Sequence, residues 1–459
     1  MGISYIDFGI ASLSAFLKLN GHKPGLIDFT FGLKNEEAIR LAKKFNPDLI
    51  CFSSRSNEFE HIVKTADLFK REFKIPIICG GIHPTIDPED ALRPCFDGIC
   101  IGEGEEALLD LVNNLDKDYL KIKNFWFNHK GKTYKNPLRQ LIKNIDELPP
   151  LDYDLFDMAK YLKARDGQID YIMSRGCPFN CSYCVNHVLQ ELYKGNERYV
   201  RLRSIDKVIE DLKKIKEKYE IKNIYFIDEI FNISKPRLKE FSEKYSKEIN
   251  LPFECCARAD LFDEESMQYM KKANCSKLSM AIESGDERLR KNLLNKIISD
   301  EKLIQAFHLA RKYKIHTMSF NMIGLPYETP QQIEKTIELN RKAKPDSIQV
   351  STFIPFKGTE LYNFCKTNNL LLESKLDISY YLGIYLKNPN LSPRQLDRCR
   401  KIFSYKCYKD RSKIKAVSLL FRDILIPYYL KYGIYIPLQL KKMIYYLFWN
   451  TKMFKFMGK

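Results

Sequence analysis

The sequence lacks the features of a spanning, exported or disordered chain. It has no stretch of 18 uninterrupted apolar residues, which argues against a transmembrane helix. No basic residue precedes the apolar part of its first residues, and no small-residue cleavage site follows, so we expect no secretory signal. Repeats and Ser/Gly-rich tracts are missing too, and 45% of the residues are hydrophobic. These absences predict folded domains in the cytoplasm.

The 13 cysteines and the distribution of charge further limit the class of protein that this sequence can encode. Most cysteines stand singly in apolar runs, as Cys51, Cys79 and Cys100 do, and we expect buried thiols there rather than a disulfide framework. The net charge of +17 is uneven. Residues 411–459 hold ten basic residues and one acid, a net +9, and the other 410 residues contribute +8. No nucleic-acid motif accompanies this charge, so we expect no nucleic-acid partner.

Residues 1–125 predict a doubly wound α/β domain. Apolar runs alternate with amphipathic runs at 35–45 and 58–72, a pattern typical of a parallel sheet covered by helices. Glycine-rich tips follow two of the runs, where ligands of such folds bind. The predicted strands are residues 25–30, 48–54, 76–81 and 97–102.

Residues 126–168 predict a linker, and residues 169–356 a second alternation of strands and helices. Six strands, each paired with a helix, favour a partial (β/α)6 barrel, whose chemistry lies at the carboxyl ends of the strands. Among its helices we expect 205–219 and 331–342, the latter opened by a Thr329–Gln332 capping box. Residues 357–459 look mainly helical. The barrel strands are predicted at 170–175, 222–228, 253–258, 277–284, 317–324 and 346–355.

Three cysteines crowd the loop after the first barrel strand. Cys177, Cys181 and Cys184 have the spacing C-x3-C-x2-C. A zinc site is one interpretation, because His187 could complete a Cys3His set. An iron–sulfur cluster is the other: three thiolates with no obvious fourth leave one iron open to an outside ligand, as catalysis requires.

"CPFNCSYC" and the predicted barrel resemble the radical S-adenosylmethionine enzymes. The resemblance implies that the three cysteines hold a [4Fe-4S] cluster whose open iron binds S-adenosylmethionine. Electron transfer then cleaves that ligand to methionine and a 5′-deoxyadenosyl radical. It also implies an electron donor such as flavodoxin or ferredoxin.

The resemblance and the strand ends together give candidate S-adenosylmethionine contacts. We expect Tyr183 to lie against the adenine and Arg258 to meet the carboxylate. Four candidates also have a structural alternative: Arg258 could pair with Asp260, Glu283 could cap the following helix, and Asp228-Glu229 could form a solvated turn. The full set of candidate contacts is Tyr183, Asp228, Glu229, Arg258, Glu283, Ser284 and Gly324.

Residues 2–28, "GGIHPT" (80–85) and "IGEGEEALLDLV" (101–112) resemble the cobalamin-binding domain that precedes one subgroup of this family. That domain's first strand and its loop, which in some members carries Asp-x-His-x-x-Gly, have no counterpart in this sequence, so we expect this chain to bind cobalamin weakly or not at all. A lone histidine such as His83 is more often structural. The contacts implied for cobalamin are Gly80, Gly81, His83, Gly102 and Gly104.

The resemblance therefore implies cobalamin-dependent methylation of an unactivated carbon. A non-methylating radical reaction such as oxidative ring closure is one alternative, and a zinc-stabilised binding protein is another. The basic, aromatic stretch 411–459 has two interpretations: helices that pack on the barrel, or a surface that contacts a membrane, with Pro427 and Pro437 dividing it into short helices. Such contact would suit a lipid-like substrate as well as a small molecule, and it would make a cytoplasmic protein peripheral at the membrane.

Overall fold

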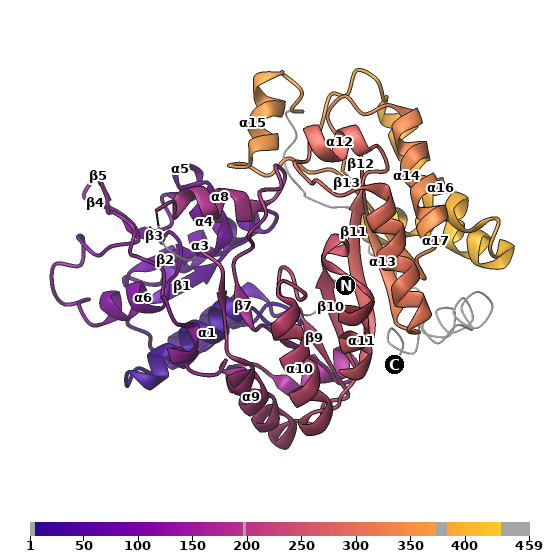
Figure 1. Cartoon of the computed structure of the whole chain (residues 1–459). Coiled ribbons are helices and arrows are strands. Elements are labelled where there is room, and N and C mark those ends of the chain that lie inside the picture. The colour runs from indigo at the N-terminus through magenta and orange to yellow at the C-terminus, as the bar shows by residue number, and fades with distance from the viewer. Residues whose placement is uncertain (1–4, 196–198, 373–382, 433–459) are drawn as a thin grey trace. The chain divides into compact units, whose positions relative to one another are not determined.

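A computed structural model describes residues 5–195, 199–372 and 383–432 (Figure 1). The chain divides into two compact units, each with its own sheet. We call the first the N-terminal unit and the second the barrel unit. The N-terminal unit comprises Met1–Ala164, Val185–Arg203 and Phe356–Gly358, and the barrel unit comprises Arg165–Cys184, Ser204–Pro355 and Thr359–Lys459.

The N-terminal unit contains a five-stranded sheet in the order β1-β2-β3-β4-β5. The first three strands are parallel, and β4 and β5 continue the sheet antiparallel. Its apolar core gathers around side chains such as Phe59, Phe69 and Phe96, which are almost completely buried. The strands are β1 (Ile50–Ser53), β2 (Ile77–Gly80), β3 (Gly98–Cys100), β4 (Phe125–His129) and β5 (Lys132–Lys135), with a short β8 (Arg201–Leu202) further along the chain.

The helices of the N-terminal unit begin and end at polar signals. The side chain of Asp7 caps α1 by accepting a hydrogen bond from Ile10 N at 3.0 Å, and Asn46, in the left-handed region, ends α2. These helices are α1 (Phe8–Leu19), α2 (Asn35–Phe45), α3 (Phe59–Glu72), α4 (Ile82–Ile86), α5 (Pro88–Ala91), α6 (Glu105–Val112), α7 (Met158–Ala164) and α8 (Val185–Leu192), with turns η1 (Ile145–Glu147) and η2 (Tyr153–Leu155).

Three expectations for this unit were wrong. Residues 25–30 form no strand: Ile27 and Phe29 pack against the core without joining a ladder. The linker does not begin at 126, because β4 and β5 extend the sheet to Lys135. Lys130 and Gly131, with φ of 49° and 75°, form the tight turn that joins them. Cys51 is exposed, because β1 is the edge strand of the sheet in the part of the chain described.

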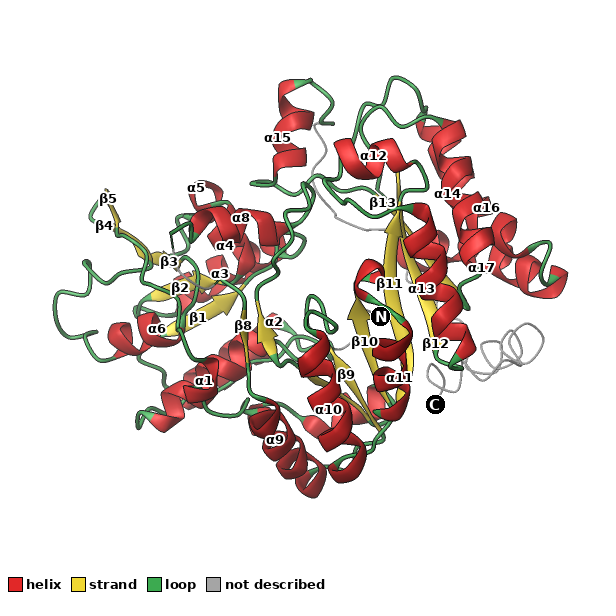
Figure 2. Ribbon diagram, viewed as in Figure 1, coloured by secondary structure: helices red, strands yellow, loops and turns green. Residues whose placement is uncertain are grey.

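The barrel unit contains the six parallel strands that the sequence predicts (Figure 2). They follow one another in chain order, β6-β9-β10-β11-β12-β13, so the sheet is an open (β/α)6 barrel. The strands are β6 (Gln168–Tyr171), β9 (Asn223–Phe226), β10 (Phe253–Ala257), β11 (Cys275–Glu283), β12 (His316–Ile323) and β13 (Ser347–Thr352), and the short β7 (Ser174–Arg175) follows β6.

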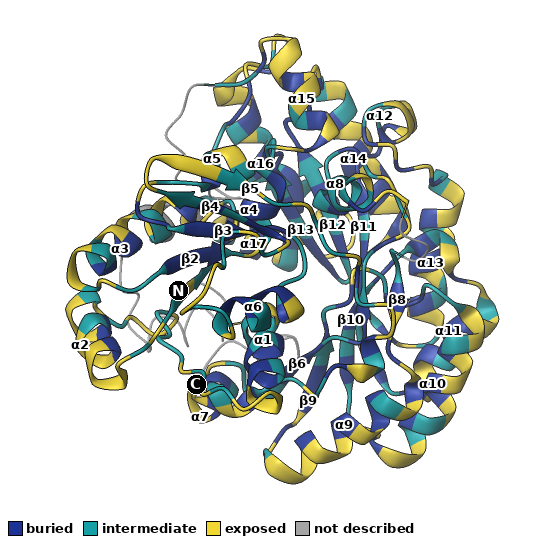
Figure 3. Ribbon diagram, turned by 90° about the vertical axis from the view of Figure 1, so that its left-hand side faces the viewer, coloured by how far each residue is buried: buried dark blue, intermediate teal, exposed yellow. Residues whose placement is uncertain are grey.

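Amphipathic helices cover the outside of this sheet. Figure 3 shows their exposed outer faces and the buried strands. The predicted capping box of α14 is confirmed: Thr329 accepts from Gln332 N, and the Gln332 side chain accepts from Thr329 N. The helices are α9 (Ile205–Lys218), α10 (Lys235–Glu248), α11 (Glu264–Lys272), α12 (Glu287–Asn292), α13 (Asp300–Lys312), α14 (Pro330–Ala343), α15 (Glu360–Thr367), α16 (Pro393–Tyr408) and α17 (Lys413–Tyr432), with the turn η3 (Ala259–Leu261).

The last helix corrects a further expectation, because α17 continues through Pro427 to Tyr432. A proline inside a helix leaves the carbonyl four residues earlier without its usual donor. That carbonyl belongs to Asp423, and it accepts a 3.4 Å hydrogen bond from Nη1 of Arg400 on α16. Pro437 lies outside the described residues. None of the described helices is long and apolar enough to cross a membrane.

Candidate active site

The three clustered cysteines lie on the loop that follows β7. Cys177 is buried, and Cys181 and Cys184 are partly exposed. The N–H of Cys184 donates to Cys181 O at 3.0 Å, which closes a tight turn. Burial, together with the nearby Cys184 and Cys181, raises the pKa of the Cys177 thiol to about 11, although a hydrogen bond from the Phe179 backbone acts in the opposite direction. As thiolates these side chains therefore need a cationic partner, and iron ions fit this donor set.

Among the described residues, one group of three potential metal ligands has all its donor atoms within 4.8 Å of one another, and it is His83, Asp87 and Asp90. The three cysteines are not part of that group. His187, the fourth ligand of the zinc interpretation, lies on α8 (Val185–Leu192), which begins directly after Cys184.

Backbone contacts hold this cysteine loop in place. The N–H of Ser182 donates to Leu294 O at 3.1 Å, and the N–H of Leu361 donates to Ser182 O at 2.9 Å. The Asn295 amide donates to Asn180 O at 2.7 Å. The loop is thus fixed by the residues after α12 and by the start of α15, so its thiols are positioned in advance.

The structure brings two predicted contacts together, Tyr183 and Glu283. The Tyr183 hydroxyl donates to Glu283 Oε1 at 3.0 Å. Glu283 ends β11 with φ of 64°, a strained conformation for this residue. Burial and then the Glu283 charge raise the pKa of Tyr183 well above its ordinary value. The buried Lys296, which the sequence analysis missed, lies 3.6 Å from Glu283 Oε1 and compensates its charge. Glu283 does not cap the next helix, because Asp286 does.

Arg258 follows β10 and contacts the cysteine loop. Its guanidinium carbon lies 3.6 Å from the centre of the Phe179 ring, a close cation–π contact. Its Nε is 2.8 Å from Asp260 Oδ1, so the ion pair given as its structural alternative is present. Asn232 bonds both the N–H and the carbonyl of Arg258 at 3.0 Å. Arg258 is therefore held firmly against the loop of the cluster ligands.

Asp228 is buried, so its side chain does not belong to a solvated turn. The neighbouring Glu229 is exposed. The Asp228 carboxylate accepts from Met173 N at 3.1 Å and from the Ser174 hydroxyl. It thereby ties β9 to the segment that leads into the cysteine loop. Burial raises its pKa to about 7, while the hydrogen bonds from Ser174 and Met173 act in the opposite direction.

The remaining predicted contacts lie after β11 and β12. Ser284 is completely buried, and its hydroxyl accepts from Asp286 N at 3.2 Å. Gly324 has φ of 77°, which requires glycine, and its N–H donates to Glu328 Oε2 at 2.6 Å. Leu325 N donates to the same oxygen at 3.1 Å. Sequence analysis missed Glu328, although an acid four residues after a turn glycine is a readable sign of such a bond.

In the N-terminal unit, the glycines predicted to contact cobalamin lie after β2 and β3, at the carboxyl edge of the parallel strands. Gly81, with φ of 97°, approaches Ser54 so closely that a Cβ would lie 2.7 Å from its carbonyl oxygen. At Gly102 the Tyr193 hydroxyl fills the space of a side chain. At both positions the close neighbour belongs to the chain itself, so these glycines serve internal packing in this structure. The glycines are Gly80, Gly81, Gly102 and Gly104.

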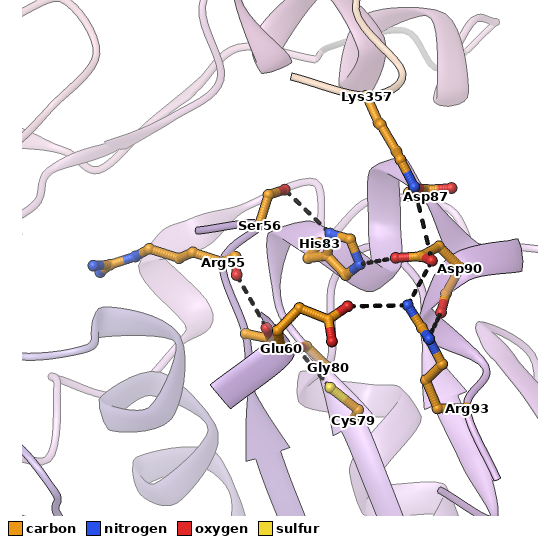
Figure 4. A network of polar contacts seen from close by, with 11 residues as sticks. Arg55, Ser56, Glu60, Cys79, Gly80, His83, Asp87, Asp90, Arg93 and Lys357 are labelled. Carbon is orange, nitrogen blue, oxygen red and sulfur yellow. Dashed lines mark hydrogen bonds and ion pairs between the residues drawn. The ribbon is translucent and has the colours of Figure 1, made fainter. Parts of the chain in front are cut away.

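His83 belongs to a network of polar contacts in the same unit (Figure 4). It is almost completely buried, with Nδ1 3.2 Å from Ser56 Oγ and Nε2 3.2 Å from Asp90 Oδ2. Lys357 Nζ lies 3.1 Å from Asp87 Oδ2 and 3.7 Å from Asp90 Oδ1. Both ring nitrogens of His83 thus face groups of this network, which supports a structural role for His83. Lys357 supplies a positive charge from the chain itself to Asp87 and Asp90.

A loop with three thiolates at the carboxyl ends of parallel strands is typical of an iron–sulfur enzyme of the radical type. Sequence comparison leads to the same class of enzyme. The chain matches the radical SAM superfamily over residues 171–339 and the B12 binding domain over residues 2–112. It is 31% identical over 380 residues to an uncharacterized methyltransferase of Pyrococcus horikoshii, covering 81% of each chain. It is 24% identical to cytidylyl-2-hydroxyethylphosphonate methyltransferase of Streptomyces wedmorensis, covering 77% of this chain and 73% of that one.

Solved structures share the fold. The radical S-adenosylmethionine methyltransferase TsrM of Kitasatospora setae, with cobalamin and a [4Fe-4S] cluster bound, superposes with a TM-score of 0.68 at 16% identity, covering 80% of this chain and 73% of that one. The cobalamin-dependent enzyme OxsB gives 0.71 at 17% identity, covering 94% and 70%.

The chain belongs to the radical SAM superfamily, to the members that carry a B12 binding domain in front of the radical SAM domain. It is an enzyme, and its cofactors are a [4Fe-4S] cluster, S-adenosylmethionine and cobalamin. The zinc-stabilised binding protein is thereby set aside.

Proposed function

We propose that the enzyme methylates an unactivated carbon of a small-molecule or lipid-like substrate in the cytoplasm. The observation that carries this proposal is the three-thiolate loop of the barrel in a chain that also has a B12-binding domain. Two relatives support a carbon acceptor by their names. They are bacteriochlorophyllide d C-8(2)-methyltransferase of Chlorobaculum tepidum and hopanoid C-3 methylase of Methylococcus capsulatus, both 24% identical.

S-adenosylmethionine would lie over the carboxyl ends of the strands beside the cysteine loop. Tyr183, fixed by its hydrogen bond to Glu283, would present its ring to the adenine. Arg258, held by Asp260 and Phe179, would reach the ligand carboxylate with the guanidinium nitrogens not used by Asp260. Ser284 and Gly324 would approach the ligand through their backbones. Asp228 would hold the entrance of the cysteine loop, with Glu229 beside it.

Cys177, Cys181 and Cys184 would hold the cluster. When bound, the cluster supplies the electron that cleaves S-adenosylmethionine, and the cobalamin supplies the methyl group. The glycines after β2 and β3 would contact the cobalamin, and His83 would brace their loop through Ser56 and Asp90. A flavodoxin or a ferredoxin would deliver the electron.

The test uses the reconstituted full chain under anaerobic conditions with excess cobalamin, reductant and S-adenosylmethionine. We expect a burst of S-adenosylhomocysteine equal in amount to the bound cobalamin, because the first methyl transfer needs no substrate. Omission of cobalamin should abolish the burst. Formation of 5′-deoxyadenosine with no S-adenosylhomocysteine in either reaction would overturn methylation and favour a non-methylating reaction such as ring closure.

A further inference from the structure

Three donor groups of the N-terminal unit face one another directly after β2. His83 lies on α4, Asp90 lies on α5, and Asp87 joins the two short helices. Their donor atoms, one from each side chain, all lie within 4.8 Å of one another, and no other group of three in the described part of the chain does so. Figure 4 shows the three side chains in one network with Lys357.

Two of these groups are held by their other polar atom, which fixes the direction of the donor. His83 is 4% exposed, its Nδ1 lies 3.2 Å from Ser56 Oγ, and the Phe59 ring packs against it with centroids 3.9 Å apart. Asp90 Oδ1 accepts a 2.8 Å hydrogen bond from Nη2 of Arg93. Its Oδ2 is thereby directed at His83 Nε2, at 3.2 Å. Outer contacts of this kind orient the ligands of metal sites.

The distances and the donor types match a divalent cation. Two ligand atoms bound to one ion at about 2.1 Å lie about 3 to 3.5 Å apart. The 3.2 Å between His83 Nε2 and Asp90 Oδ2 is within that range. Asp87 Oδ2 is buried and accepts no hydrogen bond, although Lys357 Nζ lies 3.1 Å away. One imidazole and two carboxylates suit first-row transition ions such as Mn²⁺ and Zn²⁺.

The protonation and the charge of the network also suit a cation. A neutral imidazole carries its proton on either nitrogen, and with the proton on Nδ1, donated to Ser56, the lone pair of His83 Nε2 faces the carboxylates. The chain itself places a positive charge here, since Lys357 Nζ lies 3.1 Å from Asp87 and 3.7 Å from Asp90. The side chains of Asp87 and Asp90 are 19% and 25% exposed, so an ion can enter from their side.

We infer that His83, Asp87 and Asp90 bind one divalent transition-metal ion, which displaces the Lys357 ammonium from the two carboxylates. Water completes the coordination, because three protein ligands leave positions open. The ion joins α4 to α5 directly after β2 and so stabilises the loop there. The site belongs to the N-terminal unit, whereas the cysteine loop belongs to the barrel unit. The inference goes beyond methylation, and its test does not depend on methyl transfer.

The test titrates Mn²⁺ into the full chain after the cluster has been loaded and excess iron removed by gel filtration. Loss of the electron paramagnetic resonance signal of free Mn²⁺ measures binding. Mn²⁺ prefers oxygen and nitrogen ligands to thiolates, so the cysteines do not compete for it. We expect one Mn²⁺ per chain, and displacement of that ion by Zn²⁺, which binds such ligands more tightly.

Two variants should move the affinity in opposite directions. Asp87→Asn should weaken Mn²⁺ binding at least tenfold through loss of a ligand. Lys357→Met should tighten it, because no ammonium then competes for the carboxylates. Two matched controls remove an exposed acid of α5 and the lysine that pairs with it. They are Glu89→Gln and Lys135→Met, and both should bind Mn²⁺ as the wild type does.

Circular dichroism establishes that each variant keeps its fold, and electron spin echo modulation of the bound Mn²⁺ should show one imidazole nitrogen. Absence of Mn²⁺ binding by the wild type overturns the inference, even if Lys357→Met binds the ion, because Lys357 is then the only cation of the site. Equal affinity in wild type and Asp87→Asn overturns it too, because the ion then lies elsewhere. A bound ion without the imidazole signal contradicts ligation by His83 and likewise overturns it.

Discussion

The Tyr183 hydroxyl donates a 3.0 Å hydrogen bond to Oε1 of Glu283, 100 residues further along the chain. The bond joins the cysteine loop to the end of β11, and Lys296 compensates the carboxylate from 3.6 Å. The tyrosine ring beside the third cysteine is therefore fixed by the barrel and not by the loop alone.

Tyr183→Phe keeps the ring and removes this bond. We expect the cluster to form normally and the dissociation constant of S-adenosylmethionine to rise about fivefold, since one hydrogen bond contributes about 1 kcal/mol. Equilibrium dialysis measures the constant. Tyr327→Phe is the control, because the exposed Tyr327 hydroxyl bonds only Asn368 among the contacts described, at 3.3 Å. Equal affinity in wild type and Tyr183→Phe would show that Tyr183 does not orient the ligand.

Arg258→Ala should weaken S-adenosylmethionine binding at least tenfold, about 1.4 kcal/mol, through loss of the carboxylate contact. Arg258→Lys should recover only part of the affinity, because an ammonium cannot both stack on Phe179 and bind two oxygens. Iron content should stay the same in both variants. If the affinity is unchanged and only the melting temperature falls, then Arg258 serves solely to brace Phe179 and pair with Asp260.

Cys181→Ala should lose most of its iron, because three thiolates are the fewest that hold a cube with one open iron. Cys399→Ala on α16, also partly exposed, should keep the iron of the wild type. Iron assay and the brown absorption of the reconstituted protein report both. Equal iron loss in the two variants would mean that general damage, and not ligation, explains the effect.

Two buried acids should make stability fall as pH rises. Burial raises the pKa of Asp228 to about 7 from 3.8 and that of Glu328 to about 8 from 4.5, although each accepts hydrogen bonds that lower it. Between pH 4 and 8 the folded chain therefore holds protons that the unfolded chain has released. The free energy of unfolding then declines with rising pH across this window and levels off above it.

Glu328→Gln should reduce the decline in melting temperature between pH 5 and pH 8, because the amide oxygen still accepts from Gly324 and Leu325 but no longer titrates. The free energy involved is on the order of 2 kcal/mol. Glu338→Gln, on the exposed side of α14, should leave the decline unchanged. A Glu328→Gln variant with the full wild-type decline would show that Glu328 does not titrate in this range.

Local sequence patterns predicted the six barrel strands, the capping box of α14 and the position of the cysteine loop. Each depends on neighbours in the chain: apolar runs, a Thr-Pro-x-Gln start and a fixed cysteine spacing. Three features depend instead on partners that only the folded chain supplies. They are the role of Lys296, the continuation of α17 through Pro427, and the absence of strand pairing at residues 25–30. In the sequence, for example, Glu283 is only an acid at the end of a predicted strand, and its contacts with Lys296 and Tyr183 become visible in the folded chain.

The most direct test of the central claim is the reduction of the reconstituted chain with dithionite in the presence of S-adenosylmethionine. The product measured is 5′-deoxyadenosine. The account predicts brown protein with about four irons per chain, 5′-deoxyadenosine and methionine in equal amounts, and neither product from Cys181→Ala. A colourless protein that retains zinc, or a four-iron protein that forms no 5′-deoxyadenosine, would contradict it.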